Sequence, residues 1–326
     1  MKNNVSLKEI GEALKAAESV LIFPHVNPDG DALGSAAALC CALRRSGKNA
    51  WILMEEETPE YIGFLDKGYC TRDKDCVGIP DVCICVDCSE EDRFPGRADA
   101  FRRGKVRLTL DHHAVDRGAG DYYYVDPSEA AAAQIVFKLL KEMGEPLESA
   151  IAEPLYAGIV TDTGSFQYSN TTAETHRIVG ELFEAGIDHT GIMIRLYQNV
   201  SFKKVELQRR ILETMEVFAK GRAAIAYVTE EMLKETGAVL DDAEGTVDIL
   251  RNIEGVEIAA FLKEKPEEVK VSMRAKSYGN VDVIARKFGG GGHIKAAGCT
   301  MELPVAEAAD ILKKEIIASF GALEND

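Results

Sequence analysis

The sequence contains no apolar run of the roughly 18–20 residues that a membrane-spanning helix needs. Residues 1–10 are polar and lack the apolar stretch of a signal peptide. Eight cysteines among 326 residues are too few for a disulfide-stabilised scaffold. We therefore expect a globular cytoplasmic protein with no membrane partner.

The sequence also has fewer basic than acidic residues. Lys and Arg number 38 against 54 Asp and Glu, which gives a formal net charge of −16. This balance argues against a protein held on long nucleic acid by a broad basic surface. It is compatible with a short anionic substrate, because local arginines and bound metal ions can reverse the field inside one cleft.

The first half of the chain alternates short apolar runs with helical patterns. The apolar runs lie at residues 20–23, 50–54, 82–86 and 106–110. Alternation of this kind predicts an α/β fold with a mostly parallel sheet and helices on both faces. In such sheets, ligands bind beyond the carboxyl ends of the strands.

The second half has a different pattern. Residues 191–220 are charge-rich and helical, without proline or a turn cluster, and read as a connector. Strand-like runs and a closing helix follow. We predict a first domain over 1–190, a helical linker over 191–221, and a smaller mixed α/β domain over 222–326.

The first cluster of chemically active side chains follows the run at 20–23. His25, Asp29 and Asp31 lie close together in sequence, and Pro28 and Gly30 between them fit a turn. Imidazole combined with carboxylate suits Mn²⁺, Fe²⁺ or Zn²⁺. The alternative is a polar turn in which Asp31 caps the following helix. The cluster alone leaves both interpretations open.

Three more segments place metal-binding side chains directly after apolar runs: Asp87, Asp111-His112-His113 and Asp162. For Asp162 the alternative is a helix C-terminus with Gly164 in the left-handed conformation. If these side chains had only structural roles, each of the four segments would need its own unrelated reason to carry metal-binding residues at the same predicted edge of the sheet. The ligand candidates are His25, Asp29, Asp31, Asp87, His112 and Asp162. Six ligands with four carboxylates suit two divalent ions that share a bridging carboxylate and activate water for displacement at phosphorus.

A glycine run at residues 289–292 precedes His293. The run lacks the Lys-Ser/Thr of a P-loop, so it does not predict that nucleotide site. Glycines still allow a ligand to approach the backbone closely, and their N–H groups can surround an oxyanion. A flexible loop is the alternative.

These motifs together resemble the DHH phosphoesterase superfamily. The resemblance rests on His25-x-x-Pro28-Asp29-x-Asp31-x-x-Gly34-Ser35, then Asp87, Asp111-His112-His113 and Asp162. The tail resembles the DHHA1 domain of that superfamily through Ser272-Met273-Arg274 and Phe288-Gly289-Gly290-Gly291-Gly292-His293-x-x-Ala296-Ala297-Gly298. The resemblance covers nearly the whole chain and is strongest to the compact nanoRNase and pAp-phosphatase group.

The resemblance also implies roles for individual residues. It implies two Mn²⁺ ions, one held by His25 and Asp29, the other by Asp31, His112 and Asp162, with Asp87 between them. Asp111 would orient the neighbouring histidine ligand, and His113 would face the scissile phosphate. Gly290, Gly291, Gly292 and His293 would bind the terminal phosphate of the substrate, with Arg274 beside them.

The implied function is hydrolysis of very short oligoribonucleotides to mononucleotides, and removal of the 3′-phosphate from 3′-phosphoadenosine 5′-phosphate (pAp). The alternatives are hydrolysis of cyclic dinucleotides or of linear pApA and pGpG, a family II pyrophosphatase, a RecJ-type exonuclease, and a nucleotide sensor without activity. The segment 289–293 counts against the pyrophosphatase, and the filled ligand set counts against the sensor. The oligomeric state stays open, with a homodimer as one option.

Overall fold

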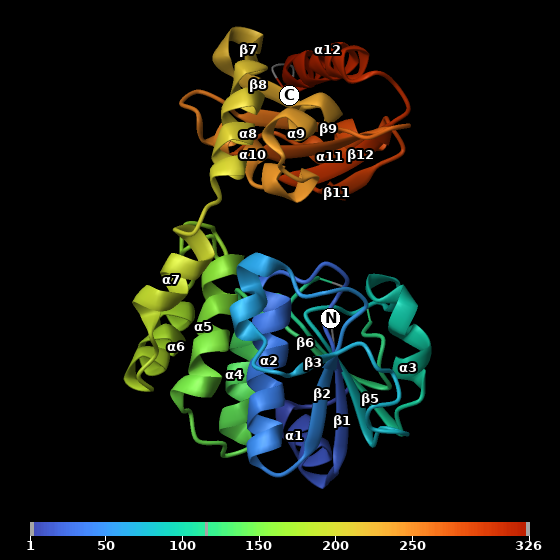
Figure 1. Ribbon diagram of the computed structural model, residues 1–326, viewed down its shortest axis with the longest axis vertical. Coiled ribbons are helices and arrows are strands. Elements are labelled where there is room, and N and C mark those ends of the chain that lie inside the picture. Colours follow the sequence, from blue (N-terminus) through green and yellow to red (C-terminus); the bar gives the residue numbers. More distant parts are fainter. Residues whose placement is uncertain (1–2, 115–116, 324–326) are drawn as a thin grey trace. The chain divides into compact units, whose positions relative to one another are not determined.

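The computed structural model describes residues 3–114 and 117–323 and divides into two compact units, Met1–Asn199 and Val200–Asp326 (Figure 1). None of the helices in the described residues combines the length and apolarity that a membrane crossing requires. Each unit is built on its own six-stranded sheet.

The first unit contains a wholly parallel sheet with the strand order β3-β2-β1-β4-β5-β6. Its strands are β1 (Ser19–Phe23), β2 (Asn49–Leu53), β3 (Cys70–Thr71), β4 (Val82–Val86), β5 (Val106–Asp111) and β6 (Tyr122–Val125). The strand order reverses between β1 and β4. At such a reversal the connecting chains leave in opposite directions and open a crevice at the carboxyl ends of the strands.

Helices cover both faces of this sheet, as the strand–helix alternation predicts. Alternate residues of β1 point to opposite cores: Val20 and Ile22 pack with the helices on one face, Leu21 and Phe23 with α3 on the other. On the first face, α2 (Gly30–Arg45) and α4 (Ala132–Glu142) contact the strands. Helix α1 (Leu7–Ala16) packs against α4, and α5 (Ser149–Asp162) packs against both α2 and α4, with α6 (Ala173–Glu184) and α7 (His189–Tyr197) in contact with α5. Helix α3 (Ala98–Arg102) lies on the opposite face (Figure 1).

Helices α2 and α5 approach each other through glycines. A Cβ atom on Gly34 would lie 2.4 Å from the carbonyl oxygen of Pro154, and one on Gly158 would lie 2.8 Å from Oδ1 of Asp31. Any side chain at these positions would push the two helices apart. The close crossing matters for function because α2 carries Asp31 and α5 ends at Asp162.

Two details of the first unit differ from expectation. The N-cap of α2 is Asp29 rather than Asp31, because Oδ1 of Asp29 accepts hydrogen bonds from the N–H groups of Asp31 and Ala32, both at 3.0 Å. The helix therefore begins earlier, and Asp31 lies buried in its first turn. The sequence analysis also missed β6, an edge strand formed by consecutive tyrosines, whose aromatic side chains favour extended backbone.

The segment expected to be one helical linker, 191–221, is interrupted. It contains the end of α7, then α8 (Phe202–Glu213) and a short strand, β7 (Glu216–Phe218). The hydroxyl of Ser201 accepts a hydrogen bond from the N–H of Lys204 at 3.2 Å and starts a new helix there. Leu207 and Ile211 of α8 belong to a core of the second unit.

The second unit has a mixed sheet with the order β11-β12-β10-β9-β8-β7, in which only β8 and β9 run parallel. Its remaining elements are β8 (Ala223–Val228), β9 (Ile258–Glu264), β10 (Val269–Ala275), β11 (Gly291–His293), β12 (Ala296–Met301), α9 (Glu230–Thr236), α10 (Thr246–Asn252), α11 (Val281–Arg286) and α12 (Val305–Leu323). One core forms against α11 and α12 and the other against α8 and α10. The predicted α/β fold with a smaller mixed second lobe is confirmed.

We expect Gly34→Ala to destabilise the first unit by about 1–3 kcal/mol, because the added methyl group meets backbone of α5 and the crossing must widen. Gly180→Ala in α6 is a matched control, since nothing lies within 4 Å of its added Cβ. That change should stabilise the protein by up to about 1 kcal/mol. Denaturation followed by the fluorescence of the single tryptophan, Trp51 in β2, reports on this unit. Equal midpoints for both variants would contradict the tight crossing.

Candidate metal centre

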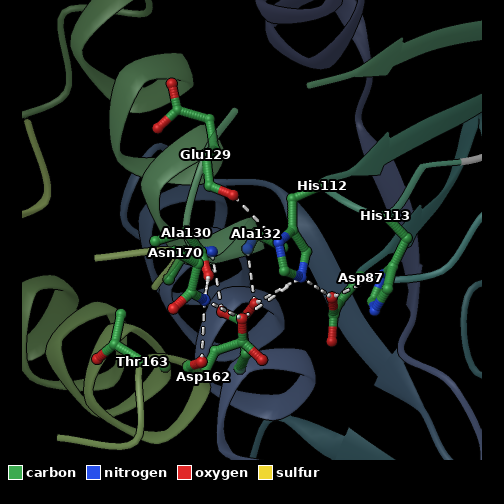
Figure 2. A network of polar contacts seen from close by, with 12 residues as sticks. Asp87, His112, His113, Glu129, Ala130, Ala132, Asp162, Thr163 and Asn170 are labelled. Atoms are coloured by element: carbon green, nitrogen blue, oxygen red, sulfur yellow. Dashed lines mark hydrogen bonds and ion pairs between the residues drawn. The ribbon is translucent and has the colours of Figure 1, made fainter. Parts of the chain in front are cut away.

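The six predicted ligands converge at the carboxyl edge of the first sheet, where the strand order reverses. They come from five places: the loop after β1 (His25), the start of α2 (Asp29 and Asp31), the end of β4 (Asp87), the end of β5 (His112), and the last residue of α5 (Asp162). Several of them appear in Figure 2 with their neighbours. They form two groups of three, in each of which the ligand atoms lie within 4.8 Å of one another.

The first group consists of His25, Asp29 and Asp87. Nε2 of His25 lies 3.6 Å from Oδ2 of Asp87 and 4.0 Å from Oδ1 of Asp29. Nδ1 of His25 is engaged by the carbonyl oxygen of Val26 at 2.7 Å. This contact fixes the ring so that Nε2, the nitrogen free to bind a cation, faces the carboxylates.

The second group consists of Asp31, His112 and Asp162. Nε2 of His112 lies 3.9 Å from Oδ2 of Asp31 and 3.7 Å from Oδ2 of Asp162. The same Nε2 atom is 3.3 Å from Oδ1 of Asp87. Asp87 therefore directs one carboxylate oxygen toward each group, as a bridging ligand does. Its backbone is left-handed (φ 60°), a conformation that Asp tolerates better than most residues.

Two buried atoms at the centre of this arrangement show that a cation fits it. Oδ1 of Asp87 and Nε2 of His112 are both buried, and neither has a hydrogen-bond partner among the described residues. Unpaired polar atoms of this kind are costly in a protein interior. Donor atoms that share one ion at about 2.1 Å lie roughly 3–3.5 Å apart, close to the separations seen here. Imidazole and carboxylate donors of this type suit divalent transition metals.

The pKa values of the carboxyl groups also indicate that a cation fits this site. Burial, with the charges of Asp87 and Asp162, raises the pKa of Asp31 well above its usual range. Burial also raises the pKa of Asp162 to about 6, against the opposing charge of His112. Without a cation, these crowded carboxylates resist full ionisation.

The pKa of the His112 imidazole is affected in the opposite way by burial and by its charged neighbours. Burial alone would lower the pKa of His112, but contact with Asp87 and the charge of Asp31 raise it to about 10. For Asp87 the effects are reversed. Burial alone would raise the pKa of this carboxyl group, but contact with His112 and His25 outweighs burial and lowers the pKa to about 2. The protein thus uses its own imidazoles to offset the negative charge, and a divalent cation would supply the missing compensation.

Asp111 has a different role from the expected one. Its Oδ1 accepts hydrogen bonds from Nδ1 of His113 at 2.8 Å and from the main-chain N–H of His112 at 2.7 Å, while Ser89 donates to Oδ2 at 2.6 Å. The ring of His112 is held instead by the carbonyl oxygen of Glu129, at 3.3 Å from Nδ1. Asp111 therefore fixes the end of β5 and the ring of His113 rather than the ring of the ligand. The hydrogen bond that His113 donates to Asp111 raises the pKa of His113, whose side chain is 47% exposed.

The end of α5 satisfies both interpretations offered for Asp162. The helix ends there, and Gly164 is left-handed (φ 55°), so the backbone is a helix C-terminus. The Asp162 side chain nevertheless faces the second ligand group. It is placed by a helix rather than by a strand. The sequence analysis missed Glu129, Ser89 and Asn170, because their contacts use main-chain atoms or leave no recognisable spacing.

The candidates Arg274, Gly290–Gly292 and His293 lie together in the second unit. Arg274 of β10 pairs with Ala296 of β12, and Ala296 pairs with His293 of β11, so the three occupy one cross-strand row on the same face. Ala296 is small and leaves space between the Arg274 and His293 side chains. Arg274 is half-buried and His293 is exposed.

Two of the glycine N–H groups considered from the sequence as an anion cradle have partners within the second unit. The N–H of Gly290 donates to the carbonyl oxygen of Ala285 at 3.0 Å, and that of Gly292 donates to Oδ1 of Asp282 at 2.9 Å. The requirement for glycine is steric instead. A Cβ on Gly290 would lie 2.1 Å from the carbonyl oxygen of Gly298, and one on Gly292 would lie 2.5 Å from that of Ala296.

A parallel sheet whose carboxyl edge holds two donor groups joined by one carboxylate defines a metal-dependent enzyme. Comparison with known proteins makes this specific. Residues 19–159 match the DHH family, N-terminal domain, and residues 220–321 match the DHHA1 domain. The chain belongs to the DHH/DHHA1 family and is a metal-dependent phosphoesterase.

Individual relatives agree with the family assignment. The bifunctional oligoribonuclease and PAP phosphatase NrnA of Thermus thermophilus is 34% identical over 301 residues, which covers 91% of this chain and 88% of the relative. The protein of the same name from Bacillus subtilis is 28% identical over 299 residues, covering 90% and 92%. The crystal structure of an exopolyphosphatase-related protein from Bacteroides fragilis has the same fold, with a TM-score of 0.92, 24% identity and full coverage of both chains.

We expect Asp87→Asn to abolish tight binding of both ions and to lower kcat/KM by roughly three orders of magnitude, because both donor groups lose their shared carboxylate. Asn tolerates the left-handed backbone at this position, so the fold should persist. Metal content after dialysis and steady-state kinetics measure the two effects. Asp121→Ala, which removes a surface partner of Arg107, is the matched control and should retain both ions. An Asp87→Asn protein that holds two ions would refute the bridging role.

Proposed function

We propose that this protein hydrolyses very short oligoribonucleotides to mononucleotides and removes the 3′-phosphate from pAp, using two divalent ions, of which we favour Mn²⁺. The observation that carries the proposal is that Asp87 belongs to the first donor group and also faces the second. Its Oδ2 lies 3.6 Å from Nε2 of His25, and its Oδ1 lies 3.3 Å from Nε2 of His112. The relatives named as oligoribonucleases and PAP phosphatases, which align along most of this chain, support the choice of substrates.

When bound, the two ions would supply an activated water and charge stabilisation at the phosphoryl group. A side chain of the protein would then protonate the leaving group. Nδ1 of His113 is engaged by Asp111, which leaves Nε2 available to donate a proton to the oxygen that departs from phosphorus. The water oxygen would bond to phosphorus as the P–O bond to the leaving oxygen breaks, and the leaving oxygen would take the proton from His113. The proton released by the water would pass to solvent, from which His113 regains one, and Asp111 would hold the imidazole in the required orientation.

The second unit would recognise the terminal phosphate. Arg274 and His293 flank Ala296 on one sheet face, and their Cα atoms stand roughly two strand spacings, or about 10 Å, apart. Two cationic or hydrogen-bonding side chains at that separation can converge on one phosphate. Gly298 and Gly291, in the neighbouring row, present no side chain to obstruct it.

The overall charge of the protein supports short substrates. A net charge of −16 offers little attraction to long RNA, so affinity must come from a few local contacts.

The cysteines support a reducing compartment. All eight are free, and most are buried. Free cysteines in this number are typical of the cytoplasm, where we place the reaction.

A substrate panel tests the proposal. With Mn²⁺ present, we expect rapid loss of pApA, pGpG and pAp, slower loss of a five-residue RNA, and survival of a long RNA. Cyclic di-AMP and pyrophosphate complete the panel, and Asp87→Asn serves as the blank. The proposal fails if only cyclic di-AMP or pyrophosphate turns over, or if long RNA is degraded as fast as pApA.

Replacement of Arg274 by Ala tests recognition of the terminal phosphate. Loss of one charge-assisted hydrogen bond of about 1.5–3 kcal/mol should raise KM for pApA roughly 10- to 100-fold, with a much smaller effect on ApA, which lacks that phosphate. Arg209→Ala on the surface of α8 is the matched control and should change neither value. Equal losses on pApA and ApA would exclude a phosphate-specific role for Arg274.

A further inference from the structure

The main chain at the start of α4 orients two of the three ligands in the second group. The carbonyl oxygen of Glu129 contacts Nδ1 of His112 at 3.3 Å. The N–H groups of Ala132 and Ala133 donate to Oδ2 and Oδ1 of Asp31, at 2.6 and 2.9 Å. The alanines are fully buried, so this segment acts through its backbone while its methyl groups pack in the core.

The third ligand reaches the same segment through Asn170. Nδ2 of Asn170 lies 3.0 Å from the carbonyl oxygen of Ala130, 3.1 Å from that of Asp162, and 3.5 Å from Oδ2 of Asp162 (Figure 2). Three oxygen acceptors require the amide nitrogen, not the amide oxygen, to point toward them. One side chain therefore joins Asp162 to the segment 129–133 that holds Asp31 and His112.

The chain between Asp162 and Asn170 is bent into an unusual turn that makes this contact. Gly164, Ser165 and Phe166 are left-handed in succession, with φ of 55°, 57° and 66°. Such a conformation is strained at non-glycine residues and persists only where the surrounding structure enforces it. Buried Thr163 holds the turn: its hydroxyl accepts from the N–H of Phe166 at 3.1 Å, and its carbonyl accepts the next two N–H groups.

The first ligand group has separate support. His25 is oriented by the carbonyl oxygen of Val26 and Asp29 by the N–H groups of its own helix. The backbone of Asp87 is held by Leu110 of β5, through a hydrogen bond of 3.0 Å from its N–H. None of these contacts involves Asn170 or residues 129–133.

We propose that Asn170 is a positioning residue that controls occupancy of one metal site, the site formed by Asp31, His112 and Asp162. It does so by holding Asp162 against the backbone segment that orients the other two ligands. This inference rests on the proposed two-metal function, because it assigns one ion to each group. Without Asn170, the strained turn can relax and carry Asp162 away, while the His25 site stays intact.

The test is metal titration of metal-free protein with Mn²⁺, by calorimetry and by electron paramagnetic resonance. We expect the unaltered protein to bind two ions and to show the spectrum of a coupled pair. Asn170→Ala should bind one ion with unchanged affinity and the second 10- to 100-fold more weakly, the usual cost of losing a contact behind a ligand. Its spectrum should become that of an isolated Mn²⁺ ion. Asp162→Asn, which removes the ligand itself, should give the same spectrum.

Asn4→Ala is the matched control. Asn4 also ties main chain through its amide, donating to the carbonyl oxygen of Asp121 at 2.8 Å and accepting from the N–H of Tyr123 at 2.7 Å. This variant should retain two ions with unchanged affinity. Where Asn170→Ala does not fold, by circular dichroism of the metal-free protein, Asn170→Ser keeps one donor and should show the same loss in weaker form.

Three results would overturn the inference: two ions bound by folded Asn170→Ala with unchanged affinities, equal weakening of both ions, or fewer than two ions in the unaltered protein. A separate result would overturn only the proposed function. If the unaltered protein binds a coupled pair and Asn170→Ala loses one ion, yet no substrate of the panel is hydrolysed, the positioning role stands and the assigned activity falls.

Discussion

Mutual repulsion among carboxylates gathered at one edge of a parallel sheet is the constraint on which the first unit depends. Asp31 and Asp87 are almost wholly buried, and Asp162 points toward the same space. Two imidazoles offset part of this charge, yet Oδ1 of Asp87 and Nε2 of His112 stay buried without a hydrogen-bond partner in the described part of the chain. No such cluster would form unless the surrounding fold held it rigidly, and much of the unit can be understood as that support.

The support is made mainly of backbone. Glycines allow α2 and α5 to cross closely enough to bring Asp31 and Asp162 together. Carbonyl oxygens of Val26 and Glu129 set the orientation of the two histidine ligands. Left-handed residues occur at Asp87 and in the turn after Asp162. Strain at functional positions is common, because a ligand atom must point where the chemistry needs it rather than where the chain would relax.

Most of the fold, and the gathering of the six candidate ligands at one sheet edge, could be predicted from the sequence for a simple physical reason. A strand buried on both faces, such as β4, is a continuous apolar run, so a polar residue directly after it is conspicuous. Hydrogen bonds to the main chain leave no such signal, because a carbonyl oxygen is the same at every residue. The orientation of His112 by Glu129 therefore could not be foreseen, and Asp111 was assigned to the wrong ring. The break before α8 comes from the local cap at Ser201, which the sequence analysis did not use, whereas pairing with β5 decided the tyrosine strand β6.

The first and last ligands of the metal centre lie near opposite ends of the first unit. His25 follows β1, whereas Asp162 ends α5, and Asn170 lies still further along. A ribosome must therefore have released nearly the whole unit before the second group, Asp31, His112 and Asp162, can hold an ion with all three ligands. Once bound, the ions link the earliest and latest segments of the unit into one cooperative block. Opening of either end would then cost the free energy of metal binding as well as that of packing, so the stability of the closed unit would rise with the concentration of available metal.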